Sequence, residues 1–135
     1  VLMVVDPRKQ AATLNSAQAA ANAQRAGVEQ AQRGVETLQA QQQALLSALQ
    51  TAESNFRRYE TLFQQQAASR QDFEQAQNQL AQAQSALEAN RAQVEAQRAA
   101  VATARRQYQS AQAGAQEQRV QLGYHQIRAP FAGVV

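Results

Sequence analysis

Apolar residues recur every seven positions along almost the whole chain, and this period limits the possible folds more than any other feature. Two series three residues apart form the repeat in each half of the chain, which is the a/d pattern of a coiled coil. We therefore expect long α-helices that pack along a narrow apolar seam. The first-half series are Leu14, Ala21, Val28, Val35, Gln42, Leu49, Phe56 and Phe63, with Ala17, Gln24, Ala31, Leu38, Leu45, Ala52 and Tyr59. The second-half series are Phe73, Leu80, Leu87, Val94, Val101, Tyr108, Ala115 and Leu122, with Ala76, Ala83, Asn90, Gln97, Ala104, Ala111 and Gln118.

The repeat changes phase near the middle of the chain. Seven residues after Phe63 comes the charged Arg70, whereas the new series starts at Phe73. Ser69 has the residue type of a helix N-cap, and Asp72 follows three residues later as in a capping box. The phase change and the cap together predict two helices that fold back as an antiparallel hairpin. One unbroken helix that dimerises with a copy is the alternative, but it explains neither feature.

The two series also predict how the arms of the hairpin align. A turn centred near Gln66 places Gln42 opposite Asn90 within an otherwise apolar seam. A buried polar pair costs stability but disfavours other alignments, so we expect Gln42 and Asn90 to set the register. An alignment of Gln42 with Gln97, one heptad away, would contradict this. The same register predicts the pairs Tyr59–Phe73, Phe56–Ala76 and Leu45–Leu87, and four aromatic residues near the turn (Phe56, Tyr59, Phe63 and Phe73) are expected to hold the tip closed.

Both ends of the chain have the composition of β-structure, and we expect the chain to be part of a longer protein. The Asp6-Pro7 pair predicts a helix start, because Asp caps free amides and Pro suits the first helical position. Gly123 is expected to end the second helix in a left-handed conformation. The predicted organisation is a strand at 1–6, a helix at 7–65, a tip turn at 66–68, a helix at 69–123 and a strand-and-turn segment at 124–135.

Composition excludes most catalytic classes. Ala (31) and Gln (28) dominate the 135 residues and only 5% are aromatic, so the chain lacks the large side chains of a compact enzyme core. There is no Cys and one His, His125, so we expect neither a thiolate site nor a His-based metal site. No nucleophile–base pair, carboxylate dyad or phosphate loop is visible, and an enzyme is not expected. The net charge of +3 is too small and too dispersed to predict nucleic-acid binding.

Three residues near the predicted tip form a spaced pattern. Arg58 and Leu62 lie four apart on one helical face, at c and g positions beside the seam, and Ser69 follows seven residues later. Taken singly, they are a solvated arginine, a leucine that flanks the core and a helix cap.

With their surroundings, these residues resemble a known family. The spacing Arg58-x3-Leu62-x6-Ser69 is similar to the Arg-Leu-Ser motif at the hairpin tip of the periplasmic adaptor proteins, also called membrane fusion proteins of the HlyD family. Residues 2–7 (LMVVDP) resemble the end of that family's first half-lipoyl segment, and residues 127–135 (IRAPFAGVV) resemble the opening of the second. The resemblance covers essentially the whole chain, although the family often has Gly where Gln66 stands.

The resemblance implies a mainly α fold, in which a long two-helix antiparallel coiled-coil hairpin lies between two half-lipoyl β segments. Such adaptors link an inner-membrane transporter of the ABC, RND or MFS class to an outer-membrane channel of the TolC type, and several copies, commonly six, surround a conduit. Arg58, Leu62 and Ser69 would contact the channel. The resemblance further implies a periplasmic location and a parent protein anchored to the inner membrane. No cofactor or metal is expected, because the chain has one His, no Cys and a single lysine, Lys9, at the helix start.

Two other functions fit parts of the pattern. A structural coiled-coil scaffold with no transport role would form an obligate long dimer rather than a monomeric hairpin. An amphipathic helix on a membrane surface would have a polar face rich in Lys and Arg, whereas the polar face here consists mainly of Gln.

Overall fold

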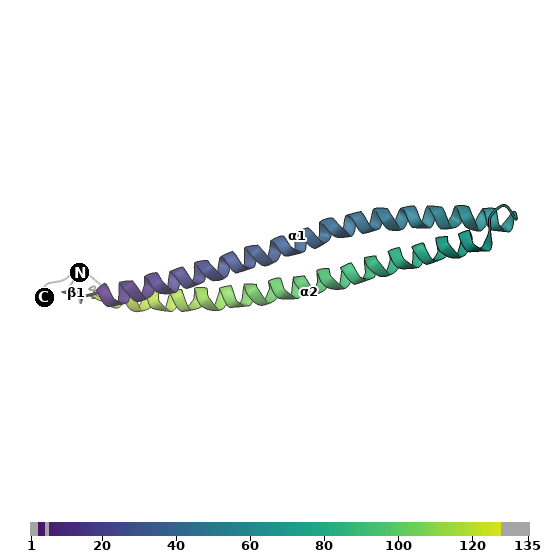
Figure 1. Cartoon of the computed structure of the whole chain (residues 1–135). Coiled ribbons are helices and arrows are strands. Elements are labelled where there is room, and N and C mark those ends of the chain that lie inside the picture. Colours follow the sequence, from purple (N-terminus) through teal and green to yellow (C-terminus); the bar gives the residue numbers. More distant parts are fainter. Residues whose placement is uncertain (1–2, 5, 128–135) are drawn as a thin grey trace, which may run out of the picture. The chain divides into compact units, whose positions relative to one another are not determined.

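The computed structural model describes residues 3–4 and 6–127, and it shows a two-helix antiparallel hairpin (Figure 1). The elements follow in the order β1 (Met3–Val4), α1 (Arg8–Gln64), α2 (Arg70–Gly123) and β2 (Gln126–Ile127). The predicted hairpin is thus confirmed, with helix bounds within one residue of those expected. A single unbroken helix through residues 65–69 is excluded.

The two strands pair with each other at the ends of the hairpin. β1 and β2 are antiparallel, with Met3 opposite Ile127 and Val4 opposite Gln126. Each strand has two residues, so this pairing is too short to identify a half-lipoyl segment. Most of the predicted segment at 124–135 lies outside the described residues, and the lipoyl-like fold stays a prediction.

The start of α1 follows the predicted cap. The Asp6 carboxylate accepts a hydrogen bond from the Arg8 backbone amide at 3.1 Å, and the Ala11 amide donates to the Pro7 carbonyl at 2.8 Å. Asp6 therefore satisfies an amide that has no partner within the helix, and Pro7 occupies a position where no amide hydrogen is needed.

The chain forms two compact units, which we call the terminal unit (Val1–Ala31 and Ala100–Val135) and the tip unit (Gln32–Ala99). Leu14 and Leu122, from opposite ends of the sequence, belong to the same unit. Each unit contains one stretch of α1 and one of α2, side by side and antiparallel (Figure 1).

The heptad pattern identifies the inward face of α2. Its buried and half-buried residues are the fifteen predicted positions of the second-half series and no others. In α1, thirteen of the fifteen predicted positions are buried or half-buried, and Gln24 and Phe63 are exposed. The most buried apolar side chains are Ala21, Val28, Ala76, Leu87, Val94 and Val101.

The end of α2 differs from the prediction. Among the described glycines none has a positive φ, so the prediction of a left-handed cap at Gly123 is wrong. Instead the helix tightens in its last turn, where the Tyr124 amide donates to the Gln121 carbonyl and the His125 amide donates to the Leu122 carbonyl, both at 3.2 Å. These i to i−3 bonds satisfy the last carbonyls without a left-handed residue.

In the part of the chain that the structure describes, no helix is long and apolar enough to cross a membrane.

Candidate functional site at the hairpin tip

Helix α1 ends in a Schellman motif built around a glutamine. Gln66 has a φ of 58°, the left-handed conformation in which helices often end. The Ala67 amide donates to the Leu62 carbonyl at 2.8 Å, and the Gln66 amide donates to the Phe63 carbonyl at 3.0 Å. Gly normally fills this position because a side chain costs about 1 kcal/mol or more there. Gln66 thus adopts a conformation that is typical of glycine.

Helix α2 starts with the predicted capping box. The Ser69 hydroxyl accepts a hydrogen bond from the Asp72 backbone amide at 3.1 Å and donates one to Asp72 Oδ2 at 2.6 Å. The same Oδ2 atom accepts a hydrogen bond from the Ser69 amide at 3.3 Å. The three bonds hold the first turn of α2 against the end of the tip turn, so the prediction that Ser69 starts this helix is confirmed.

Three of the four aromatic residues that were predicted to hold the tip closed, Phe56, Phe63 and Phe73, form ring contacts behind the turn. Phe73 stacks on Phe63 with ring centroids 5.1 Å apart and an interplanar angle of 15°. It also lies against Phe56, with centroids 5.6 Å apart at 38°. Phe73 from α2 therefore contacts two rings that are one heptad apart on α1, which is consistent with the predicted register. Phe63 remains 40% exposed, because α2 has no seam residue beyond Phe73 to cover its outer side.

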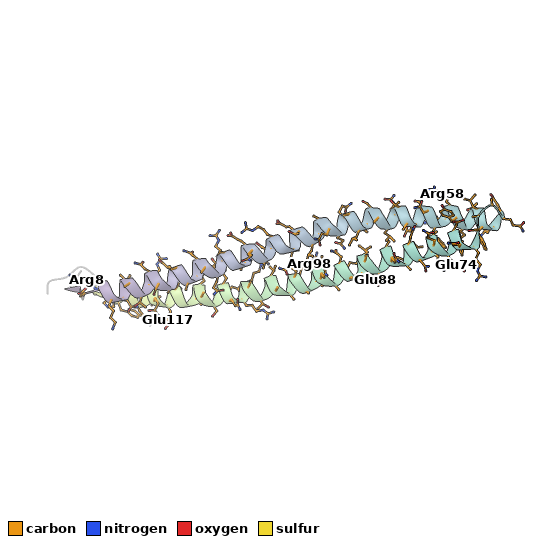
Figure 2. The ribbon with its side chains drawn as sticks, in the orientation of Figure 1. Arg8, Arg58, Glu74, Glu88, Arg98 and Glu117 are labelled. Carbon is orange, nitrogen blue, oxygen red and sulfur yellow. The ribbon has the colours of Figure 1, made fainter. Side chains whose placement is uncertain are left out.

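The three spaced residues lie around this closed tip. Arg58 is exposed on α1, and its Nη2 donates to Asn55 Oδ1 at 3.0 Å. Leu62 is half-buried one turn later, and Ser69 is exposed at the start of α2. Figure 2 shows Arg58 on α1 near the end where the chain reverses. The hairpin thus brings Arg58, Leu62 and Ser69 to one end of the tip unit, and their role in binding stays a prediction.

A shallow groove crosses the face of the tip between the two helices. Arg58, Tyr59, Asp72 and Ala76 are among the residues that line it. Ala76 is 3% exposed and Tyr59 is half-buried. The full lining is Asn55, Arg58, Tyr59, Asp72, Gln75, Ala76 and Gln79. Sequence reasoning identified Asp72 only as a capping acid, because its place on the same groove as Arg58 depends on how the two helices pack.

An exposed ion pair lies in the first turns of α2. Arg70 Nε donates to Glu74 Oε1 at 2.7 Å, between residues four apart on the helix. The hydrogen bond and the charge of Glu74 raise the pKa of the Arg70 guanidinium. Both side chains are mostly exposed, so the pair adds little to stability.

The predicted polar layer contains a buried asparagine. Asn90 is 5% exposed, and its Nδ2 donates to the Leu38 backbone carbonyl at 3.3 Å. Its Oδ1 is buried with no hydrogen-bond partner. Gln42 is half-buried on the facing helix, but the bond that Asn90 makes is to the backbone of Leu38. The proposal that Gln42 and Asn90 set the register therefore stays a prediction.

The alternative register is not observed. A Cβ atom placed on Gly34 would lie 2.6 Å from Nε2 of Gln97, so the Gln97 side chain packs over Gly34 and not beside Gln42. The absence of a side chain at Gly34 leaves room for this glutamine in the seam.

Among the described residues, no group of three or more His, Cys, Asp or Glu side chains is placed to hold a metal ion. Comparisons of the chain with models of known protein families, with curated protein sequences and with solved structures found no match.

Proposed function

We propose that this chain is the hairpin of a periplasmic adaptor of the HlyD type, which docks through its tip onto an outer-membrane channel of the TolC type. The observation that most supports the proposal is the construction of the tip. Arg58, Leu62 and Ser69, in the spacing of the family motif, lie around a turn that is fixed by a Schellman motif, a capping box and stacked rings.

The chemistry of the tip suits protein docking. Arg58 is exposed and has donors beyond the one that bonds Asn55, and a guanidinium binds carbonyls and carboxylates in a fixed geometry. Leu62 offers partly exposed apolar surface beside it. Because the backbone around these residues is held by local hydrogen bonds, little conformational entropy is lost when a partner binds.

The opposite end of the chain supports the same proposal. The pairing of β1 with β2 brings the entering and leaving segments together as neighbouring antiparallel strands. Two halves of a lipoyl-like β-domain would meet in this way. In the proposed assembly, the parent protein is anchored to the inner membrane, contacts a transporter there, and surrounds a conduit with other copies of itself, commonly six.

Site-specific crosslinking tests the proposal against a purely structural coiled coil. A photocrosslinking amino acid replaces Leu62 in the full-length protein in its native cells, and captured proteins are identified by mass spectrometry. The expected product contains an outer-membrane channel. The matched control places the same amino acid at Ala92, which is exposed midway along α2, and should not capture the channel. Capture of the channel from Ala92 alone, or only of other copies of this chain from Leu62, would contradict docking through the tip.

A further inference from the structure

The Ser69 hydroxyl is already engaged within its own hairpin. A serine hydroxyl has one hydrogen to donate, and here that hydrogen points to Asp72 Oδ2 at 2.6 Å. The Ser69 oxygen also accepts the Asp72 amide at 3.1 Å. A partner protein would therefore meet a serine whose donor is used, and the hydroxyl alone is a poor contact for docking.

The Asp72 carboxylate is the polar group that remains available beside it. Its Oδ2 atom is held by the amide and hydroxyl of Ser69, whereas its Oδ1 atom has no partner among the described residues. Asp72 is exposed, and in the described part of the chain it forms no ion pair with Arg or Lys. The cap therefore fixes the side chain in one orientation and leaves one carboxylate oxygen free.

Arg58 and Asp72 lie on the same groove without forming an ion pair with each other. Arg58 comes from α1 and Asp72 from α2, and both line the groove. The single side-chain bond of Arg58 goes to Asn55. One groove is thus lined by unsatisfied donors from α1 and an unsatisfied acceptor from α2, together with the buried Ala76.

From this geometry we infer that Asp72 is a docking residue of the tip, which acts together with Arg58 across the groove, and that Ser69 is the positioning residue for Asp72. The inference rests on the proposed function and names a contact within the same site. The occupant is a loop of the docking protein that offers an acceptor, such as a backbone carbonyl, to Arg58 and a donor, such as an amide or a basic side chain, to Asp72.

The charges in the groove favour a polypeptide loop over a free ion. Asp72 repels an anion that approaches Arg58, and Arg58 repels a cation that approaches Asp72, so neither ion gains the full attraction of one charge. A peptide loop has both donors and acceptors along its backbone and complements both walls at once. The amide side chains of Gln75 and Gln79, which also line the groove, offer further hydrogen bonds of either kind.

The test uses the Leu62 photocrosslinker in the full-length protein in cells, with the yield of the crosslink to the outer-membrane channel as the readout. Asp72→Asn keeps the size of the side chain and removes its charge. Loss of one charge-assisted hydrogen bond lowers affinity by roughly tenfold or more, so a similar drop in crosslink yield is expected below saturation. Glu74→Gln, the same change two residues later and outside the groove, should leave the yield unchanged.

A second pair of variants separates contact from capping. Ser69→Ala removes the hydroxyl that orients Asp72 but leaves the charge of Asp72 in place, so it should lower the crosslink yield less than Asp72→Asn does. Asp72→Glu retains the charge and the capping-box pattern and should restore most of the yield. A normal yield with Asp72→Asn, or a larger loss with Ser69→Ala than with Asp72→Asn, would overturn the inference while leaving docking through the tip intact. No channel crosslink in the unmodified background would reject the proposed function, and the inference with it.

Discussion

The tip unit and the terminal unit use the same seven-residue repeat but are held together by different side chains. In the tip unit, Phe73 contacts two other rings, and Leu87 and Val94 are each 4% exposed. In the terminal unit, Ala21, Val28 and Val101 are 8–9% exposed. Among the described residues there, Gln10 Nε2 also donates across the helices to Gln118 Oε1 at 2.9 Å and to Gln121 Oε1 at 3.0 Å. The repeat fixes which residues face inward but not how much free energy each pair contributes.

The magnitudes favour the tip unit as the more stable of the two. Burial of a large apolar side chain contributes about 1.5–3 kcal/mol, and an aromatic pair adds about 0.5–1.5 kcal/mol. A neutral hydrogen bond contributes about 0.5–1.5 kcal/mol, and less when water competes for it. We therefore expect unfolding to begin in the terminal unit, while the end that presents Arg58 and Leu62 stays folded.

The largest effect is expected from Phe73→Ala in the tip unit. The change removes both ring contacts of a half-buried residue, and we expect it to lower the free energy of unfolding by about 2–3 kcal/mol. The matched control is Tyr108→Ala in the terminal unit. Tyr108 is half-buried at the equivalent seam position but has no ring partner among the described residues, so a loss of about 1–2 kcal/mol is expected. Chemical denaturation followed by circular dichroism measures both. Equal losses would remove the difference between the units.

The next effect has the opposite sign. Asn90→Leu replaces a buried amide whose Oδ1 lacks a partner with an apolar side chain, and we expect a gain of about 1–2 kcal/mol in the free energy of unfolding. If Asn90 restricts the register, the variant should also form larger assemblies or mixed registers. Analytical ultracentrifugation would detect these assemblies. A more stable variant that remains a uniform monomer would show that Asn90 has no part in selecting the register.

Sequence periodicity predicted the inward face of the hairpin because that face depends only on which side chains repeat. All fifteen seam positions of α2 follow from it, and Ser69 and Asp72 revealed the break because a capping box is a local pattern. The left-handed Gln66 was not predicted, since the hydrophobic pattern contains no information on φ. The groove between Arg58 and Asp72 was also missed, because it exists only when two helices lie side by side.

A smaller effect is expected at Gln66, whose left-handed conformation the sequence did not predict. Gln66→Gly relieves the cost of a side chain at a φ of 58°, and we expect a gain of about 0.5–1 kcal/mol in the free energy of unfolding. Gln65→Gly is the matched control, because Gln65 is exposed, adjacent and without a positive φ, and should destabilise the chain slightly. Thermal unfolding compares the two. If both variants lose stability equally, the left-handed turn is not the conformation in solution.

Two glycines extend the comparison to both units. The Cβ of an alanine at Gly27, in the terminal unit, would have no described atom within 4 Å apart from its chain neighbours and the nearby backbone of its own helix, whereas at Gly34, in the tip unit, it would meet the Gln97 side chain. Gly27→Ala should therefore gain most of the helix-propensity difference, about 0.5–1 kcal/mol. Gly34→Ala should gain less or lose stability, because Gln97 has to move. Denaturation midpoints measured side by side decide this, and equal gains would mean that the seam around Gly34 is loosely packed.

The smallest effect is expected from the hydrogen bonds that the Gln10 side chain makes across the terminal unit. Gln10→Ala removes both bonds to α2, but alanine has the higher helix propensity and water replaces the exposed bond. The net loss should be about 0.5 kcal/mol or less.

Hydrogen exchange is more informative than global stability for Gln10→Ala, because local opening near the chain ends is detected separately from full unfolding. Faster exchange confined to residues 8–20 and 112–123, with unchanged protection around Phe73, is the expected pattern. Gln18→Ala, an exposed position on the same helix, serves as the control. Faster exchange that extended to the aromatic residues of the tip unit would show that the two units unfold as one, and that the glutamine contacts of the terminal unit also contribute to the stability of the tip.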